Sequence, residues 1–103
     1  MRRLALALLA AAIAGCSDAP PSNPAAERGR QVYLAQCVTC HGPDPALAGP
    51  IGPPIKGSSS ALIEFKVIRG AYPSGYAPKR PTAVMPPLPA LVPDVPALAE
   101  FLK

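Results

Sequence analysis

Apolar residues recur at the spacing of an α-helix in three stretches of the chain. The first stretch predicts a helix over residues 25–39, which Asn23 precedes as a candidate N-cap. Val32, Tyr33 and Cys37 lie on one face of this helix. We expect that face to pack against the core of the domain.

Two shorter helices are predicted nearer the C-terminus. The stretch SSALIEFKVIR, residues 59–69, begins with serines that can cap a helix, and Gly70 follows it as a common stop. The last helix begins at Asp94 and tolerates Pro96 in its first turn. Both stretches carry apolar side chains on one face.

The segments between the predicted helices are rich in proline and glycine. Residues 42–57 and 71–93 are of this kind, and such composition predicts loops. No stretch alternates apolar and polar residues as a half-buried strand would. The predicted fold is therefore all-α, with three main helices joined by long loops.

The N-terminus has the layout of a secretory signal peptide. Arg2 and Arg3 make a basic start, and residues 4–14 are an unbroken run of small and aliphatic residues. The run is shorter than the ~20 apolar residues that span a bilayer, and it has no polar face. We therefore expect residues 1–15 to be removed on export.

The apolar run ends in Ile13-Ala14-Gly15-Cys16, which resembles the lipobox of bacterial lipoproteins. The resemblance implies that Cys16 receives a lipid and becomes the new N-terminus. Residues 16–24 are then a proline-rich, flexible tether. The alternative is an ordinary cleavage site with a spare cysteine nearby. A free exposed thiol in an oxidising compartment is open to oxidation, which favours lipidation.

Composition shows that the mature domain needs a cross-link. Proline and glycine make up about a quarter of residues 16–103, close to the level at which composition alone suggests disorder. A domain this small buries too little apolar surface to be comfortably stable unaided. Without the leader, eight basic residues face six acidic ones. The resulting net charge of +2 is too small for a nucleic-acid-binding surface.

The motif CVTCH, residues 37–41, offers such a cross-link, and three interpretations of it compete. A thioredoxin-type redox pair needs a surrounding βαβ pattern, which the chain lacks. A structural zinc site needs four ligands, more than two thiols and one imidazole provide. The third interpretation is c-type haem attachment, in which Cys37 and Cys40 bond to the porphyrin and His41 binds the iron.

The second axial ligand of the iron is expected to be Met85. Once Met1 is lost with the leader, Met85 is the sole methionine, as His41 is the sole histidine. It stands between Val84 and two prolines, in a stiff loop that lowers the entropy cost of holding a ligand. The alternative role is a flexible packing residue. Pairing His with Met is a standard haem arrangement.

These features together resemble a small class I c-type cytochrome over residues 26–103. The matching pieces are RGRQVYLAQCVTCHG, GPPIKG, LIEFKVIRG, AVMPP and ALAEFL. The resemblance implies one covalent haem c, around which the three helices are wrapped. It also implies that the N- and C-terminal helices cross at right angles, with Gly29 at the crossing near Phe101 and Tyr33 on the same face.

The resemblance also assigns a carbonyl partner to the imidazole of His41. Pro53 in GPPIKG would accept the Nδ1 proton, and Pro50, also preceded by glycine, is the alternative. The stretch AYPSGYAPKRPTA before Met85 departs from the family pattern and looks like an insert. Its polar side chains either hydrogen-bond a haem propionate or belong to a solvated loop. The candidates are Tyr72, Tyr76, Lys79 and Arg80.

An iron bound by both His and Met has no open position, which disfavours substrate binding and leaves electron transfer. We therefore expect a monohaem electron carrier rather than an enzyme. It would be lipid-anchored on the periplasmic side of a bacterial membrane, inner or outer, and exchange single electrons with respiratory redox proteins. One alternative is a haem-bearing subunit of a larger oxidoreductase complex. A weaker one is a ligand-binding or peroxidase-like protein, which needs Met85 off the iron.

Overall fold

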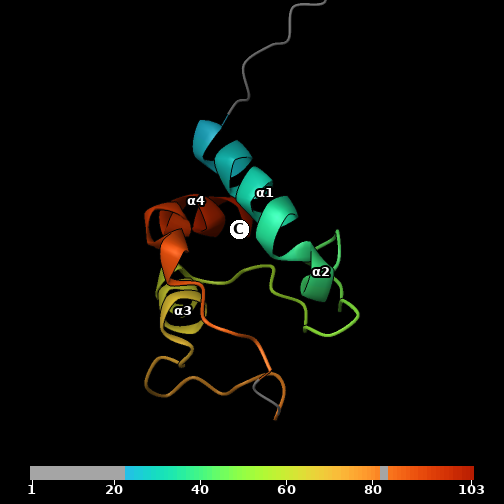
Figure 1. Ribbon diagram of the computed structural model, residues 1–103, viewed down its shortest axis with the longest axis vertical. Coiled ribbons are helices and arrows are strands. Elements are labelled where there is room, and N and C mark those ends of the chain that lie inside the picture. The colour runs from blue at the N-terminus through green and yellow to red at the C-terminus, as the bar shows by residue number, and fades with distance from the viewer. Residues whose placement is uncertain (1–22, 82–83) are drawn as a thin grey trace, which may run out of the picture.

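The computed structural model of the protein describes residues 23–81 and 84–103, which form helices joined by loops (Figure 1). The elements in chain order are α1 (Pro24–Gln36), α2 (Val38–His41), α3 (Ser60–Ile63), the π-helical segment η1 (Glu64–Ile68), the 3₁₀ segment η2 (Pro89–Asp94) and α4 (Val95–Phe101). No strand occurs in this part of the chain, which confirms the predicted all-α fold. The expected signal peptide, Cys16 and most of the tether lie outside the described residues.

The start of α1 follows from its capping residues. The Asn23 side chain accepts a hydrogen bond from the backbone N–H of Ala26 at 3.1 Å. Pro24 fills the first position of the helix, where its missing N–H has no intrahelical partner to lose. Helix α1 therefore begins one residue earlier than predicted, within the stretch assigned to the tether.

The predicted C-terminal end of the first helix is wrong. Residues 25–39 do not form one helix, because α1 stops at Gln36 and a separate turn of helix, α2, follows. Cys37, with a φ of −117°, both ends α1 and begins α2, and its carbonyl accepts the backbone N–H of His41 at 2.9 Å. Apolar spacing does not reveal a change of direction at a single residue.

The helix predicted over residues 59–69 is present with a different inner geometry. The Ser59 hydroxyl accepts the backbone N–H of Leu62 at 3.1 Å, which caps α3 as expected. The helix then widens into η1, and Gly70 ends it with a φ of +66°. The spacing of apolar residues does not distinguish an α-helical from a π-helical turn over so short a stretch.

The last helix is preceded by a turn that the sequence analysis assigned to a loop. Residues 89–93, within the predicted loop 71–93, are the greater part of the 3₁₀ segment η2. Prolines in this stretch hold φ near helical values, and such values suit a 3₁₀ helix. Asp94 is the N-cap residue of α4, and Pro96 lies in its first turn as predicted.

Helix α4 packs against α1 at a glycine (Figure 1). A Cβ atom added to Gly29 would lie 2.0 Å from the carbonyl oxygen of Ala97 and 2.8 Å from Cβ of Phe101. The Phe101 ring also packs on Tyr33, with ring centroids 5.3 Å apart. Only glycine allows this close contact between the helices, as the resemblance implied.

The core is small and joins α1, α3 and α4. Its buried apolar residues are Val32, Tyr33, Ile63, Val95, Ala97, Leu98 and Leu102. Half-buried side chains extend this core towards the CVTCH motif, among them Cys37, Val38 and Ile55. No helix within residues 23–81 and 84–103 combines the length and apolar character needed to cross a bilayer.

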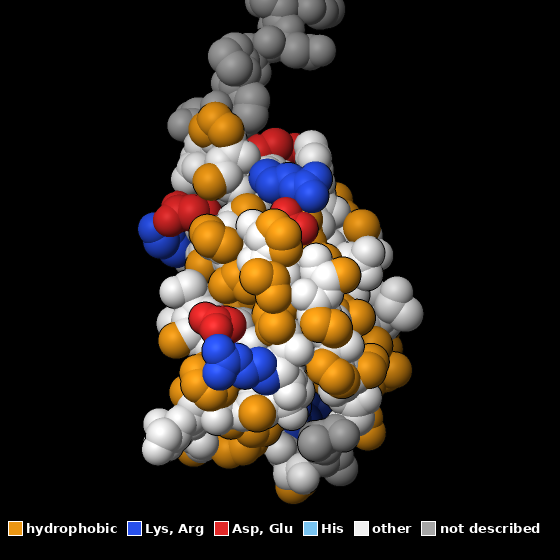
Figure 2. All heavy atoms as spheres, turned by 60° about the vertical axis from the view of Figure 1, so that its left-hand side comes forward, with side chains coloured by type: hydrophobic (Ala, Val, Ile, Leu, Met, Phe, Trp, Pro, Cys, Tyr) orange, Lys and Arg blue, Asp and Glu red, His pale blue; other side chains and the backbone are white. Residues whose placement is uncertain are grey.

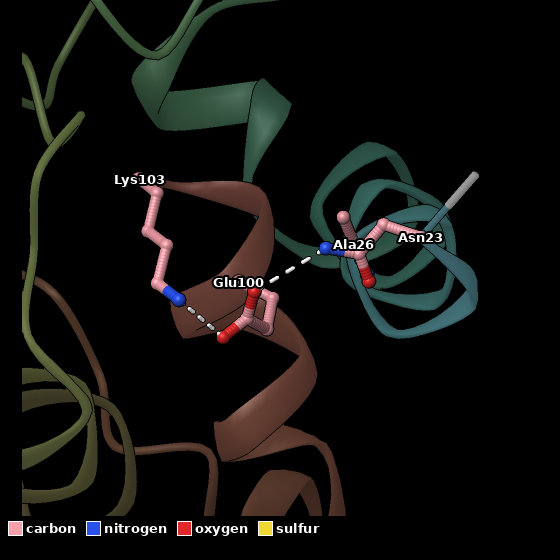
Figure 3. A network of polar contacts seen from close by, with 4 residues as sticks. All are labelled: Asn23, Ala26, Glu100 and Lys103. Atoms are coloured by element: carbon pink, nitrogen blue, oxygen red, sulfur yellow. Dashed lines mark hydrogen bonds and ion pairs between the residues drawn. The ribbon is translucent and has the colours of Figure 1, made fainter. Parts of the chain in front are cut away.

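Acidic and basic side chains lie next to one another on the surface (Figure 2). The ion pairs are Arg28–Asp94, Arg30–Glu27, Arg69–Glu64 and Lys103–Glu100. Glu100 also accepts a hydrogen bond from the Asn23 side chain at 3.3 Å, which ties the start of α1 to α4 (Figure 3). Hydrogen bonds from Lys103 and Asn23 hold the pKa of the Glu100 carboxyl below its ordinary value.

Candidate functional site

The two thiols of CVTCH lie together at the junction of α1 and α2. Cys37 is the residue between the helices, Cys40 is in α2, and both are half-buried free thiols. Burial, and secondarily the neighbouring Cys40, raises the pKa of the Cys37 thiol to about 11. Nucleophilic cysteines of redox enzymes have a lowered pKa instead, so this environment argues against a thioredoxin-type pair.

The zinc interpretation also lacks support in the tertiary structure. Among the described residues, no group of three or more His, Cys, Asp or Glu side chains is arranged to hold a metal ion. The motif itself contains only three candidate ligands, and residues 23–81 and 84–103 bring no fourth one to it.

The imidazole of His41 is held in one orientation by a backbone carbonyl. Its Nδ1 lies 3.0 Å from the carbonyl oxygen of Pro53, and the side chain is buried. Because a carbonyl only accepts hydrogen bonds, Nδ1 carries the proton, and in the neutral imidazole Nε2 then has the lone pair that can bind a metal. Of the two prolines considered from the sequence, Pro53 and not Pro50 makes this contact.

Two glycines let the following loop approach the motif closely. The backbone N–H groups of Ile51 and Gly52 donate to the carbonyl of Cys40 at 3.1 and 2.8 Å. A Cβ atom on Gly52 would lie 2.5 Å from Nδ1 of His41, and one on Gly49 would lie 2.3 Å from the Cys40 carbonyl oxygen. The close approach of both glycines was not predicted from the sequence, although their repeat in GPIGPP directly after the motif was a usable signal.

Tyr33 fixes the other end of the motif. Its hydroxyl donates a hydrogen bond to the carbonyl of Gly42 at 2.6 Å, and its side chain is fully buried. Gly42 follows His41 and ends α2 with a φ of +78°. Helix α1 thereby holds the residue next to the imidazole in place, a role that sequence reasoning did not assign to the tyrosine hydroxyl.

Met85 lies on a separate segment from the other predicted site residues. It is half-buried in a stretch without regular secondary structure. On one side of it, the guanidinium of Arg80 donates to the carbonyl of Ile51 at 3.3 Å. On the other side, the backbone N–H of Leu88 donates to the carbonyl of Val67 at 2.6 Å. The segment therefore runs from the loop beside His41 to η1.

The insert-like loop before Met85 is ordered by contacts within the protein. The Lys79 ammonium donates to the carbonyl of Pro54 at 2.6 Å. The rings of Tyr72 and Tyr76 are stacked with centroids 5.4 Å apart, and the Lys66 ammonium lies 4.4 Å from the centroid of the Tyr72 ring. Lys79 and Tyr72 thus contact other parts of the chain although the loop lies at the surface.

The residues at this site fit a covalently attached haem. Two neighbouring thiols and an oriented imidazole with a free Nε2 occupy one end of the fold. Apolar side chains that suit a flat apolar ring occur on several elements and loops of the described chain. The half-buried ones include Val38, Ile55, Val67, Ile68 and Met85, and the exposed ones include Leu47 and Ile51.

Comparison with known proteins points to the same chemistry. Residues 26–103 match the profile of the family described as Cytochrome c, which covers about three quarters of the chain. No curated protein matches the chain.

Proposed function

The chain belongs to the cytochrome c family, which transfers electrons on covalently attached haem c, and we propose that it is a lipid-anchored carrier of single electrons between respiratory redox proteins. Bound haem supplies an iron that takes up and releases one electron by changing between its ferric and ferrous states. The observation that carries the proposal is the hydrogen bond from Nδ1 of His41 to the Pro53 carbonyl, because it presents Nε2 as a ligand beside the two thiols.

Cys37 and Cys40 are proposed to attach the haem. Each thiol adds across a vinyl group, so that sulfur bonds to one carbon, the thiol proton goes to the other carbon and no oxidant is needed. His41 then provides Nε2 as the first axial ligand, held by Pro53 and by the close approach of Gly52.

Met85 is proposed as the second axial ligand. Its segment is attached beside His41 at one end and to η1 at the other, which limits the positions that its thioether can take. His and Met together leave no position for a substrate, so the protein is proposed to be a carrier and not an enzyme. Met ligation raises the reduction potential, which places such a carrier towards the oxidising end of a respiratory chain.

The proposed anchor is remote from the proposed haem site. The tether joins the domain at Asn23, and the 13 residues of α1, about 20 Å long, separate that point from Cys37 (Figure 1). Lipid on Cys16 would therefore hold the end of the domain formed by α1 and α4, and leave the site at the other end accessible to a partner.

The distribution of charge supports transient docking near the site. Between the motif and Met85, five basic residues outnumber two acidic ones: Lys56, Lys66, Arg69, Lys79 and Arg80 against Asp44 and Glu64. Of these, Arg69 and Glu64 pair with each other, which leaves four basic residues against one acidic residue. At the tether end, by contrast, all the charged residues that the structure describes pair with one another: Glu27, Arg28, Arg30, Asp94, Glu100 and Lys103. A net positive surface beside the site speeds the encounter with an acidic redox partner.

The test uses the full chain produced in a bacterium that attaches haem. We expect the wild type to fractionate with membranes, and Cys16→Ser to be released from them with an unchanged haem spectrum. Native membranes should reduce and reoxidise the wild type. Membrane retention of Cys16→Ser would contradict the lipid anchor. Co-purification with a large partner in fixed ratio would favour the alternative of a subunit in an oxidoreductase complex.

A further inference from the structure

The loop that precedes Met85 is fastened at both of its ends. At its start, the backbone N–H of Ala71 donates to the carbonyl of Phe65 at 3.0 Å, and Tyr72 stacks beneath the Lys66 ammonium. At its end, Lys79 donates to the carbonyl of Pro54 at 2.6 Å and Arg80 donates to the carbonyl of Ile51 at 3.3 Å. The last two contacts cross from the loop to the segment that follows the CVTCH motif.

The two acceptor carbonyls flank the one that orients His41. Residues 51–54 include Pro53, whose carbonyl accepts the Nδ1 proton. The same segment is attached to Cys40 by the backbone N–H groups of Ile51 and Gly52. Lys79 and Arg80 therefore connect the chain leading to Met85 with the part of the fold that is built most tightly around the imidazole.

We propose that Lys79 and Arg80 are positioning residues for the second axial ligand, because they hold the chain that leads to Met85 against residues 51–54. This inference rests on the proposed ligand role of Met85. Hydrogen bonds from charged donors are stronger than those between neutral groups, which suits a contact at the surface. Both side chains are exposed, so each one alone contributes modestly.

The expected change in the local concentration of the Met85 thioether follows from the length of chain between the attached residues. With Arg80 attached, about 8 residues separate it from Leu88, the next residue for which the described part of the chain shows such an attachment. Without Lys79 and Arg80, the nearest upstream attachment among the described residues is Tyr72, and the span grows to about 16 residues. Loop-closure entropy scales with the logarithm of length, so the local concentration of the Met85 thioether falls about threefold.

The test measures the fraction of ferric holoprotein in which the Met85 thioether is off the iron. The variants are Lys79→Ala/Arg80→Ala and the conservative pair Lys79→Arg/Arg80→Lys, which keeps both donors. Lys56→Ala is the matched control, since the Lys56 side chain is exposed close to residues 51–54 and makes no hydrogen bond among the described residues. The probe is cyanide at a concentration low enough that the thioether rebinds faster than cyanide does, so that the observed rate is proportional to the fraction of iron from which Met85 has departed. Circular dichroism follows global unfolding separately.

We expect the double alanine variant to bind cyanide about three times faster than the wild type, and its weak far-red band of Met–iron bonding to fade at lower temperature. Lys56→Ala should behave as the wild type, and the conservative pair should restore the slow rate. A double alanine variant with a wild-type cyanide rate, or one that differs only in its unfolding midpoint, overturns the inference.

Failure of the proposed function looks different from failure of this inference. A wild type without the far-red band, whose spectrum is unchanged by Met85→Ala, would remove the ligand role of Met85 and this inference with it. A wild type that has the band and loses it in Met85→Ala, with cyanide rates unaffected at Lys79 and Arg80, would overturn the positioning role alone.

Discussion

Removing the hydroxyl of Tyr33 tests how strongly its hydrogen bond to Gly42 stabilises the CVTCH motif. Tyr33→Phe keeps the ring, and with it the packing against Phe101 at a centroid distance of 5.3 Å, and removes only the donor to the Gly42 carbonyl at 2.6 Å. The residue is fully buried, so water does not readily replace the lost partner.

The expected destabilisation follows from the cost of an unpaired buried carbonyl. A net hydrogen bond contributes about 1 kcal/mol, and leaving one partner buried without the other costs about 1–3 kcal/mol. For a domain of this size, 1 kcal/mol shifts the melting temperature by roughly 4–8 °C. We therefore expect Tyr33→Phe to unfold about 2 kcal/mol more easily, which corresponds to a shift on the order of 10 °C.

The assay is thermal and guanidinium unfolding of the ferric holoprotein, followed by circular dichroism. Tyr76→Phe is the matched control, because the structure shows no hydrogen bond from the Tyr76 hydroxyl among the described residues. That control should lose less than about 0.5 kcal/mol, as surface substitutions usually do. Equal stabilities for the two variants would refute the contribution of the Tyr33–Gly42 hydrogen bond.

Wild type and Tyr33→Phe also allow a test of how stability depends on pH, and the direction of the change follows from the pKa of Tyr33. Burial, chiefly, raises the pKa of Tyr33 above its ordinary value, so the folded state favours the protonated hydroxyl. The stability that this hydroxyl contributes is complete below the unfolded pKa of about 10 and is lost as the pH rises through the folded pKa. The difference between wild type and Tyr33→Phe should therefore be constant near neutral pH and shrink in alkali. A difference that grows in alkali would contradict the assigned donor role.

Four further substitutions test the site itself. Met85→Ala should abolish the far-red band, admit carbon monoxide or cyanide readily and lower the reduction potential; an unchanged spectrum and potential would leave Met85 a packing residue. Cys37→Ala or Cys40→Ala should yield little folded holoprotein, since a covalent attachment is lost from a domain with a small core; a well-folded, colourless domain by circular dichroism would refute this. Gly52→Ala should displace the His41 ring, because its Cβ would lie 2.5 Å from Nδ1, and destabilise the holoprotein by about 1–3 kcal/mol; a wild-type unfolding midpoint would contradict the close approach.

The sequence by itself determined the features that depend on local spacing. A pair of thiols three residues apart followed by histidine indicates covalent haem attachment, and the profile match to the cytochrome c family confirms the class of cofactor. The capping residues Asn23 and Ser59 likewise predicted where helices begin, since each satisfies backbone N–H groups only a few residues away. The assignments of the lipid anchor and of Met85 as a ligand stay predictions.

Tertiary structure decided what depends on contacts between distant segments. The break of α1 at Cys37, the choice of Pro53 over Pro50 and the close approach of Gly52 all arise where the loop 42–57 folds back on the motif. No local pattern encodes these contacts, because the two segments are joined by residues with no regular periodicity. The contacts of Lys79 and Arg80 were likewise not predictable from local sequence, and they join residues still farther apart in the chain. Their positive charge predicted binding to a propionate or to solvent, whereas the fold places backbone carbonyls some 25–29 residues earlier in the chain within reach of them.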